Sequence, residues 1–375
     1  LTAREGGANF AEEDDVLLER QRVEGAGPAG AAGSAVWIQN LRKVYPARGR
    51  APPKVAVVDL SLGVPSAECF GFLGVNGAGK TTTLSILTGD YLPSSGRAWI
   101  DGHDVVKDRR RVRERMGYCP QADPLIDLMT ARETLVMFAR LKNLPEASIP
   151  RVVSSLLERV TLTPYADRVA GSYSGGNKRK FSLAIALVGS PAVVFLDEPS
   201  SGMDPVSRRH MWEIIMRERN VRSIVLTTHS MEECEALCTR IGIMTAGRLQ
   251  CLGGQQHLKS KYGGGYTLEM RVGEGHDEQV LSAVPQLFPG ATLEHDHAGK
   301  LRYELPLDSV SLATVFEIME GRKESLGVLD YSCSQPSLES IFLAIAEKDI
   351  TKKAPPVANG GVGSAGGVEM SGVAA

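Results

Sequence analysis

Between Val36 and about Tyr262, short apolar segments alternate with segments that carry apolar residues at helical spacing. The apolar segments have the length of strands, and polar or glycine-containing stretches separate them from the helix-like segments. Such alternation is typical of an α/β domain with a mostly parallel sheet. We therefore expect one α/β domain over residues 35–262.

A different pattern follows the glycine triplet at residues 263–265. Apolar and polar residues alternate from Tyr266 to Val272, as in a half-buried strand. Helix-like and strand-like segments then follow one another up to a last helix, which has an apolar face over residues 338–345. The sequence thus predicts a small α+β domain over residues 263–348.

The two ends of the chain lack such patterns. Residues 1–34 combine an acidic stretch, a short mixed segment and a Gly/Ala/Pro run, which indicates a linker. Residues 349–375 are rich in Gly, Ala and Val with almost no charge, so we expect a disordered tail. No apolar run approaches the ~20 residues that cross a bilayer, so we expect the chain itself not to span a membrane.

Charge and cysteine content narrow the choice of partners and compartment. The 42 Lys and Arg residues nearly balance 44 Asp and Glu residues, for a net charge of -2. Without an overall positive field, binding to nucleic acid is disfavoured. The six cysteines are scattered and form no C-x-x-C pair, which fits a reducing, cytosolic environment.

A glycine-rich loop, GVNGAGKT, lies between a strand-like segment at Cys69 to Leu73 and an apolar-periodic helix. Closely spaced glycines let backbone N–H groups face phosphates, and the helix adds its positive N-terminal end. Lys80 then neutralises the outer phosphates, and the Thr81 hydroxyl can bind Mg²⁺. The predicted nucleotide-binding residues of this loop are Gly74, Val75, Asn76, Gly77, Ala78, Gly79, Lys80, Thr81 and Thr82.

Two acidic residues end the apolar, strand-like segment that begins at Val193. A phosphate loop needs a carboxylate to complete the Mg²⁺ shell, and Asp197 supplies one. Glu198 follows directly and can polarise an attacking water molecule. This pair therefore predicts hydrolysis of the nucleotide as well as binding.

The S-G-G sequence at Ser174, Gly175 and Gly176 lies just ahead of that strand. In this order and spacing, the three features resemble those of ABC ATPases. The resemblance implies a P-loop fold with a RecA-like parallel core, an antiparallel β subdomain and a helical subdomain. It also implies that the serine and its neighbouring N–H groups bind the γ-phosphate held by a partner cassette, so that two cassettes sandwich ATP and Mg²⁺.

Further positions match the same family in order. Tyr45 resembles the aromatic residue that stacks on adenine. Gln121 resembles the glutamine that senses Mg²⁺ and the attacking water and couples the site to the membrane domain. His229 resembles the histidine that contacts the γ-phosphate. The resemblance therefore assigns catalytic roles to Lys80, Gln121, Glu198 and His229, and metal binding to Thr81, Gln121 and Asp197.

The narrower match is to the A subfamily of ABC transporters, which are lipid transporters with two cassettes in one chain. It rests on YSGGNKRK at residues 173–180, FLDEP with GMDP at 195–205 and THSMEECEALC at 228–238. The first of these is similar to the second cassette of that chain, and residues 263–348 resemble the regulatory domain that follows. On this resemblance, the non-Met start makes the sequence a fragment.

The sequence thus predicts an ATP-hydrolysing cassette that powers transmembrane transport, with lipid as the substrate of the membrane domain. Its expected partners are a second cassette and transmembrane domains near Gln121, and its expected location is the cytosolic face of a membrane. Two alternatives stay open. One is a soluble ABC ATPase that acts on nucleic acid or ribosomes, and the other is a nucleotide-gated dimerisation module without hydrolysis.

Overall fold

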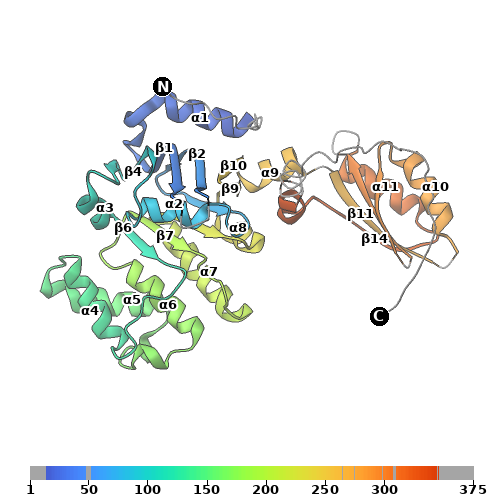
Figure 1. Cartoon of the computed structure of the whole chain (residues 1–375). Helices are drawn as coiled ribbons and strands as arrows, with labels where there is room; N and C mark the ends of the chain where they lie inside the picture. The colour runs from blue at the N-terminus through green and yellow to red at the C-terminus, as the bar shows by residue number, and fades with distance from the viewer. Residues whose placement is uncertain are drawn as a thin grey trace, which may run out of the picture.

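A computed structural model describes most of the chain, apart from its two ends and several short internal stretches. The described residues are 14–47, 52–263, 265–273, 275–297, 299–306, 310–343 and 345. Figure 1 shows a cassette that carries both sheets of the α/β domain, and a smaller α+β domain connected to it. The predicted disordered tail at residues 349–375 and residues 1–13 of the predicted linker lie outside the described residues.

The central sheet has six strands in the order β10-β9-β3-β8-β7-β6. Strands β3, β6, β7, β8 and β9 are parallel, and β10 is antiparallel to β9. Their bounds are β3 Cys69–Leu73, β6 Met116–Cys119, β7 Val193–Asp197, β8 Ser223–Thr228, β9 Arg240–Thr245 and β10 Arg248–Gly253. Strands β3, β7 and β8 are buried along their whole length, as their continuous apolar runs predict.

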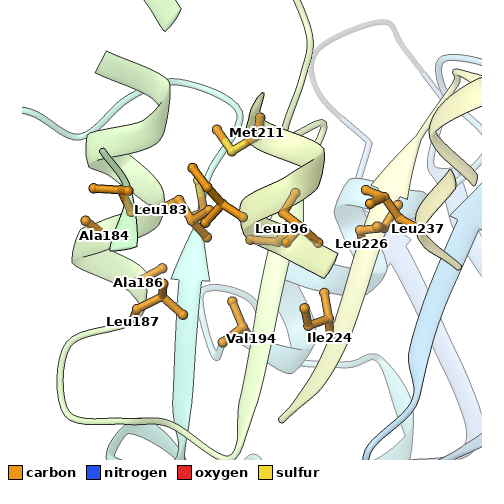
Figure 2. Packing of buried hydrophobic residues seen from close by; sticks show 14 of the residues in the cluster. Leu183, Ala184, Ala186, Leu187, Val194, Leu196, Met211, Ile224, Leu226 and Leu237 are labelled. Carbon is orange, nitrogen blue, oxygen red and sulfur yellow. The ribbon is translucent and has the colours of Figure 1, made fainter. Parts of the chain in front are cut away.

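Helices pack on this sheet through two separate apolar clusters. They are α2 Lys80–Leu87, α6 Gly175–Ala186, α7 Pro205–Arg219, α8 Met231–Leu237 and α9 Gln255–Tyr262. Figure 2 shows Leu183 and Leu187 from the α6 segment beside Val194 and Leu196 of β7, with Met211 of α7 above them. Burial of these side chains holds the start of α6 near the carboxyl end of β7.

Two smaller parts complete the cassette. An antiparallel sheet in the order β2-β1-β4-β5 lies on one side, and a helical subdomain lies on the other (Figure 1). The elements of the first part are β1 Ser34–Tyr45, β2 Lys54–Pro65, β4 Ser95–Ile100, β5 His103–Asp104 and α3 Arg109–Arg115. The helical part holds α4 Ala131–Leu141 and α5 Ile149–Arg159, and then leads into α6. The predicted combination of parallel core, antiparallel β subdomain and helical subdomain is thus confirmed.

The smaller domain has one antiparallel sheet with two helices. Its elements are β11 Gly265–Val272, α10 Asp277–Leu287, β12 Thr292–His297, β13 Lys300–Pro306, α11 Leu312–Arg322 and β14 Val328–Ser334. The strand order β12-β13-β11-β14 with the succession βαββαβ is a ferredoxin-like arrangement. Leu268 and Tyr303 of the sheet pack with Val280 and Val315 of the helices, so alternate residues face the core as predicted.

The last helical residues depart from the sequence-based grouping. Residues 338–343 are helical, and the sequence assigns them to the smaller domain. In the structure, Leu338, Ile341 and Phe342 join the core cluster of the cassette, which also contains Leu258 of α9. The chain therefore returns to the cassette after the ferredoxin-like domain. No helix in the described part of the chain is long and apolar enough to cross a membrane.

The segment before the first strand also differs from a linker. Helix α1 spans Asp14–Ala26 and continues into a 3₁₀ helix at Gly27–Ala31. Val16 and Val23 of α1 are buried against the cassette. The mixed composition of this segment hides the contact, because only one side of the helix carries apolar side chains toward the sheet.

The buried carboxylate of Glu19 connects α1 to β2. The Glu19 carboxylate accepts hydrogen bonds from Arg22 Nε at 2.8 Å and from the Gly63 backbone N–H at 2.8 Å. Arg240 donates to the Gly63 carbonyl at 2.6 Å and lies beside the same carboxylate. Burial raises the pKa of Glu19, but the hydrogen bonds from Arg22 and Gly63 outweigh it and leave the pKa below its usual value.

We expect Glu19→Gln to loosen α1, because Arg22 and Arg240 then lose their buried carboxylate. The free energy of unfolding falls by about 1.5–3 kcal/mol, measured by urea denaturation. Because the pKa of Glu19 is lowered in the folded state, this stabilisation is present above the unfolded pKa and is lost as the pH falls below about 4. Glu24→Gln, at an exposed position of the same helix, is the control and leaves stability unchanged. Equal stability of the two variants contradicts the assignment.

Candidate nucleotide site

The glycine-rich loop joins β3 to α2 at the carboxyl edge of the central sheet. Gly77 and Gly79 have φ values of 84° and 108°, which side-chain-bearing residues rarely adopt. A Cβ added to Gly79 would also lie 2.6 Å from the Ala56 carbonyl oxygen. Glycine at this position therefore lets the loop close against β2 and start helix α2 in the right direction.

Lys80 lies inside this loop with 5% of its side chain exposed. Its Nζ donates to the Gly74 carbonyl at 2.5 Å and lies 3.8 Å from Glu198 Oε1. Burial lowers the pKa of Lys80, while the carboxylates of Glu198 and Asp197 act in the opposite direction. The loop thus presents a desolvated ammonium group where the phosphates of a nucleotide would lie.

Asp197 is buried at the end of β7 and faces two hydroxyl groups. Thr81 Oγ1 donates to Asp197 Oδ1 at 3.3 Å, and the Thr227 hydroxyl donates to the same oxygen. A hydroxyl and a carboxylate are the hard oxygen ligands that suit Mg²⁺. No group of three His, Cys, Asp or Glu residues within the described ranges could hold a metal.

Glu198 leaves the sheet directly after Asp197. Its φ of 51° lies in the left-handed region, which is uncommon for a non-glycine residue and often marks a functional site. Glu198 Oε2 lies 2.8 Å from His229 Nδ1, and the backbone N–H of Glu198 donates to the Thr227 carbonyl at 3.0 Å. The turn therefore points the carboxylate toward Lys80 and His229 at the mouth of the loop.

Further predicted residues line the cleft above this loop. The cleft is lined by Tyr45, Lys54, Ala56, residues 75–82, Gln121 and Glu198. The Tyr45 hydroxyl lies 3.4 Å from Thr82 Oγ1, and its ring packs edge-on against Tyr91 with centroids 5.9 Å apart. Its ring therefore stands beside the start of α2, and both Tyr45 and Gln121 line the cleft of the phosphate loop.

The structure leaves the S-G-G sequence outside this cleft. Ser174 caps α6, and its hydroxyl accepts a hydrogen bond from the Asn177 N–H at 3.3 Å. Ser174 and Gly175 are exposed and do not line the cleft that holds Lys80. A Cβ added to Gly176 would lie 2.7 Å from Ser207 Oγ, so α6 and α7 approach closely there. The start of α6 thus does not line the cleft of its own chain.

Three residues at the site escape the sequence prediction of site residues. Arg179 is buried beneath Glu198 and lies inside the quoted segment 173–180, whereas Thr227, which donates to Asp197, directly precedes the quoted segment 228–238. Glu233 is buried beside Trp212, whose indole N–H donates to it at 3.2 Å, and burial raises the pKa of this carboxyl. Their positions in or next to the motifs could have marked these three residues as candidates. Their roles could not be predicted, because their partners come from distant segments of the chain.

Family comparisons agree with this geometry. Residues 57–201 match the ABC transporter domain family, and residues 263–335 match the ABCA1-like, C-terminal R1 regulatory domain family. The human phospholipid-transporting ATPase ABCA3 is 49% identical over 355 residues, which cover 93% of this chain and 20% of ABCA3. Mouse ATP-binding cassette sub-family A member 7 is 50% identical over 334 residues, which cover 88% of this chain and 15% of that protein. The chain therefore spans about a fifth or less of these relatives.

Solved structures show the same cassette fold. The dimeric post-hydrolysis state of the ATP-binding cassette MJ0796, bound to ADP and Pi, matches with a TM-score of 0.54 and 21% identity. That match covers 58% of this chain and 98% of the other. An ATP-binding subunit of an ABC transporter matches with a TM-score of 0.55 and 25% identity, over 61% of this chain and 94% of the other. Residues 57–201 are thus similar to ABC transporter cassettes and residues 263–335 to the ABCA1-like R1 regulatory domain, and the relatives that match most of this chain are members of sub-family A.

Proposed function

We propose that this chain is the ATP-hydrolysing cassette of a larger lipid transporter and acts at the cytosolic face of a membrane. One observation carries the proposal: Glu198 lies within reach of both the buried Lys80 and His229, at the mouth of a phosphate loop. Relatives that are named phospholipid-transporting ATPases support the lipid class. Their much greater length supports a larger protein around the cassette.

ATP binds along the cleft, with adenine on the Tyr45 ring and the phosphates in the loop. The backbone N–H groups of residues 75–80 and the N-terminal end of α2 hold the phosphates. Lys80 exchanges its contacts with the loop carbonyls for the β- and γ-phosphates. Thr81, Asp197 and Gln121 would hold Mg²⁺, which would neutralise charge on the transferred phosphoryl group.

Hydrolysis then depends on how the chain places a water molecule. Glu198 accepts a hydrogen bond from this water and directs it at the γ-phosphate. His229, whose Nδ1 lies 2.8 Å from Glu198 Oε2, orients the carboxylate and donates to a γ-phosphate oxygen through its other nitrogen. The left-handed backbone at Glu198 keeps the carboxylate above the strand end, so the reacting groups are in place before the reaction begins.

A second cassette completes the site. Ser174 and the free N–H groups at the start of α6 do not line their own cleft, and they bind the γ-phosphate on the partner's phosphate loop. The post-hydrolysis dimer of MJ0796, bound to ADP and Pi, supports such a two-cassette arrangement. Each ATP is thus held by Lys80 of one cassette and by the S-G-G helix of the other.

The transmembrane part docks on a cleft of about 790 Å³. This cleft is lined in part by β6, the strand that leads to Gln121. Its lining combines cations from α3 with apolar side chains of α4, and includes Arg109, Arg110, Arg113, Phe138, Leu141 and Lys142. Leu141 is 68% exposed, although it is a large apolar residue. An exposed apolar strip with a basic rim suits a short amphipathic helix that carries acidic residues.

The rival functions make different predictions for stimulation of hydrolysis. The near-neutral charge of the chain and its similarity to sub-family A transporters both disfavour an ATPase that acts on nucleic acid. Phospholipid vesicles should therefore stimulate the intact protein, and RNA, DNA or ribosomes should not. Glu198 lines the cleft with His229 Nδ1 at 2.8 Å from its carboxylate, and this pair argues against a module that binds ATP without hydrolysing it.

We expect Glu198→Gln to lower kcat for ATP hydrolysis by a factor on the order of 10²–10⁴, because the amide no longer attracts the water proton. ATP binding persists, since Lys80 and the loop are unchanged. Phosphate release and binding of a fluorescent ATP analogue give the two quantities. Glu232→Gln, an exposed carboxylate of α8 near the site, is the matched control with normal turnover. Full activity of Glu198→Gln would exclude this mechanism.

We expect two inactive variants to complement each other if the sites form between chains. Lys80→Ala and Ser174→Ala each remove one half of a site, but a mixed dimer keeps one intact site. Equimolar mixing restores about a quarter of wild-type ATPase activity, since half of the symmetric pairs formed at random are mixed and each has one of two sites. Activity no higher than the sum of the separate variants shows that each chain uses its own serine.

We expect Leu141→Asp to separate hydrolysis from transport, because it places a charge in the apolar part of the docking cleft. Basal ATPase activity stays unchanged, while lipid transport by the intact protein in vesicles falls by about tenfold. Val221→Asp changes a similarly exposed apolar residue between α7 and β8 and serves as the control. Equal transport by both variants places the membrane contact elsewhere.

A further inference from the structure

Arg179 is a buried arginine in α6, the helix that follows Ser174 of the S-G-G sequence. It is the fifth residue of the helix, and only 5% of its side chain is exposed. A buried guanidinium group requires several acceptors, because removal from water is costly for a charge. The partners of Arg179 come from two separate segments of the site.

One side of the guanidinium group binds the turn that carries the catalytic carboxylate. Arg179 Nη2 donates to the carbonyls of Asp197 at 2.7 Å and Glu198 at 3.1 Å, and Nε donates to the Pro199 carbonyl at 2.9 Å. Three consecutive carbonyls thus converge on one group. These contacts hold the turn in which Glu198 adopts its left-handed backbone conformation.

The other side of the guanidinium group binds residues 120–123, which we call the glutamine loop. Arg179 Nη1 donates to the Gln121 carbonyl at 3.2 Å, to the Asp123 carboxylate at 3.0 Å and to the Pro120 carbonyl. The guanidinium plane is rigid and its donors form a fixed fork. A displacement of α6 therefore moves both the Glu198 turn and the Gln121 loop.

We propose that Arg179 is a positioning residue that couples the two ATP sites of the cassette pair. In the proposed function, on which this inference rests, Ser174 at the start of α6 binds the partner's ATP, whereas Glu198 and Gln121 act on the ATP of their own chain. Arg179 lies one helical turn beyond Ser174 and contacts both of these segments. Engagement of the partner's γ-phosphate by α6 thereby sets the orientation of Glu198 and Gln121.

Arg179→Lys keeps the charge but cannot reach both segments, since an ammonium group places its three donors at one point. In the intact transporter in lipid vesicles, we expect kcat to fall by a factor on the order of 100, because Glu198 is misplaced. The dissociation constant for a fluorescent ATP analogue stays within about twofold, since Lys80 and the phosphate loop are unaffected. Arg222→Lys is the matched control: this arginine is also buried, but it pairs with Glu218 at the opposite end of β8.

The decisive measurement is how strongly kcat of the site that contains Glu198 depends on Ser174. The catalytic glutamate of the partner cassette is replaced, so that only the site with Glu198 turns over. Ser174→Ala then acts on this site only through its own chain, and we expect a fall in kcat on the order of tenfold. In the Arg179→Lys background, the same substitution should change kcat by at most about twofold. Effects that simply multiply would overturn the proposal, since they mean that Arg179 acts only on local structure.

Asp123→Ala provides a second variant in case Arg179→Lys does not fold. The Asp123 side chain is 24% exposed, and its loss removes one of the three acceptors of Arg179 Nη1 without touching the Glu198 turn. We expect kcat to fall by about tenfold with a reduced dependence on Ser174; unchanged values contradict the coupling. Glu198→Gln separates the two hypotheses. If it abolishes turnover while Arg179→Lys behaves as Arg222→Lys does, only the coupling role is wrong.

Discussion

The parallel alignment of β3, β7 and β8 is the constraint on which the site depends. In this register Leu73 lies beside Thr228, and Asp197 lies beside Thr227, so the three strands end at one level. The phosphate loop, the acidic pair and His229 therefore leave the sheet at the same edge. Residues separated by more than a hundred positions in sequence meet there because parallel strands place their carboxyl ends together.

Burial at this edge strengthens each electrostatic contact and makes each unpaired group costly. Lys80 is almost inaccessible, and it is held by loop carbonyls and by the nearby Glu198. Asp197 receives two hydroxyl donors and is likewise buried. Charges in such surroundings interact more strongly than in water, so a small shift of Glu198 or Lys80 has a large effect on the reacting phosphate.

Local patterns were sufficient to predict the phosphate loop and the acidic pair. Glycines at residues 74–79 and the apolar run before Asp197 act through backbone geometry and strand burial, which are set within a few residues. The role of the S-G-G sequence, in contrast, followed only from the resemblance to ABC ATPases. The fold class followed from the alternation of apolar strands and helical segments, since that order requires parallel crossovers.

The remaining features depend on contacts that no local pattern encodes. Arg179 meets the Gln121 loop 58 residues away, and Glu19 meets Gly63 44 residues away, only after the sheets have formed. The sequence around Arg179 or Glu19 does not indicate whether the charged side chain faces solvent or a distant partner. For the same reason, α1 resembled a linker, and residues 338–343 were assigned to the smaller domain.

The ends of the cassette converge on α9, which bears on how the regulatory domain is held. Asp15 of α1 accepts hydrogen bonds from His257 and Tyr262, and Leu338 packs with Leu258 in the same core. A Cβ added to Gly263 would lie 2.2 Å from Pro336 Cγ, so the entry to and exit from the smaller domain are adjacent.

Two adjacent connections form a double tether at one corner of the cassette. The placement of the regulatory domain then depends on α9 and residues 338–343, and the ferredoxin-like sheet can keep its own core while that corner moves. Helix α1 contacts this corner through Asp15 and also packs on β1 and β2 of the antiparallel sheet, so one helix joins the double tether to the nucleotide-binding half of the cassette.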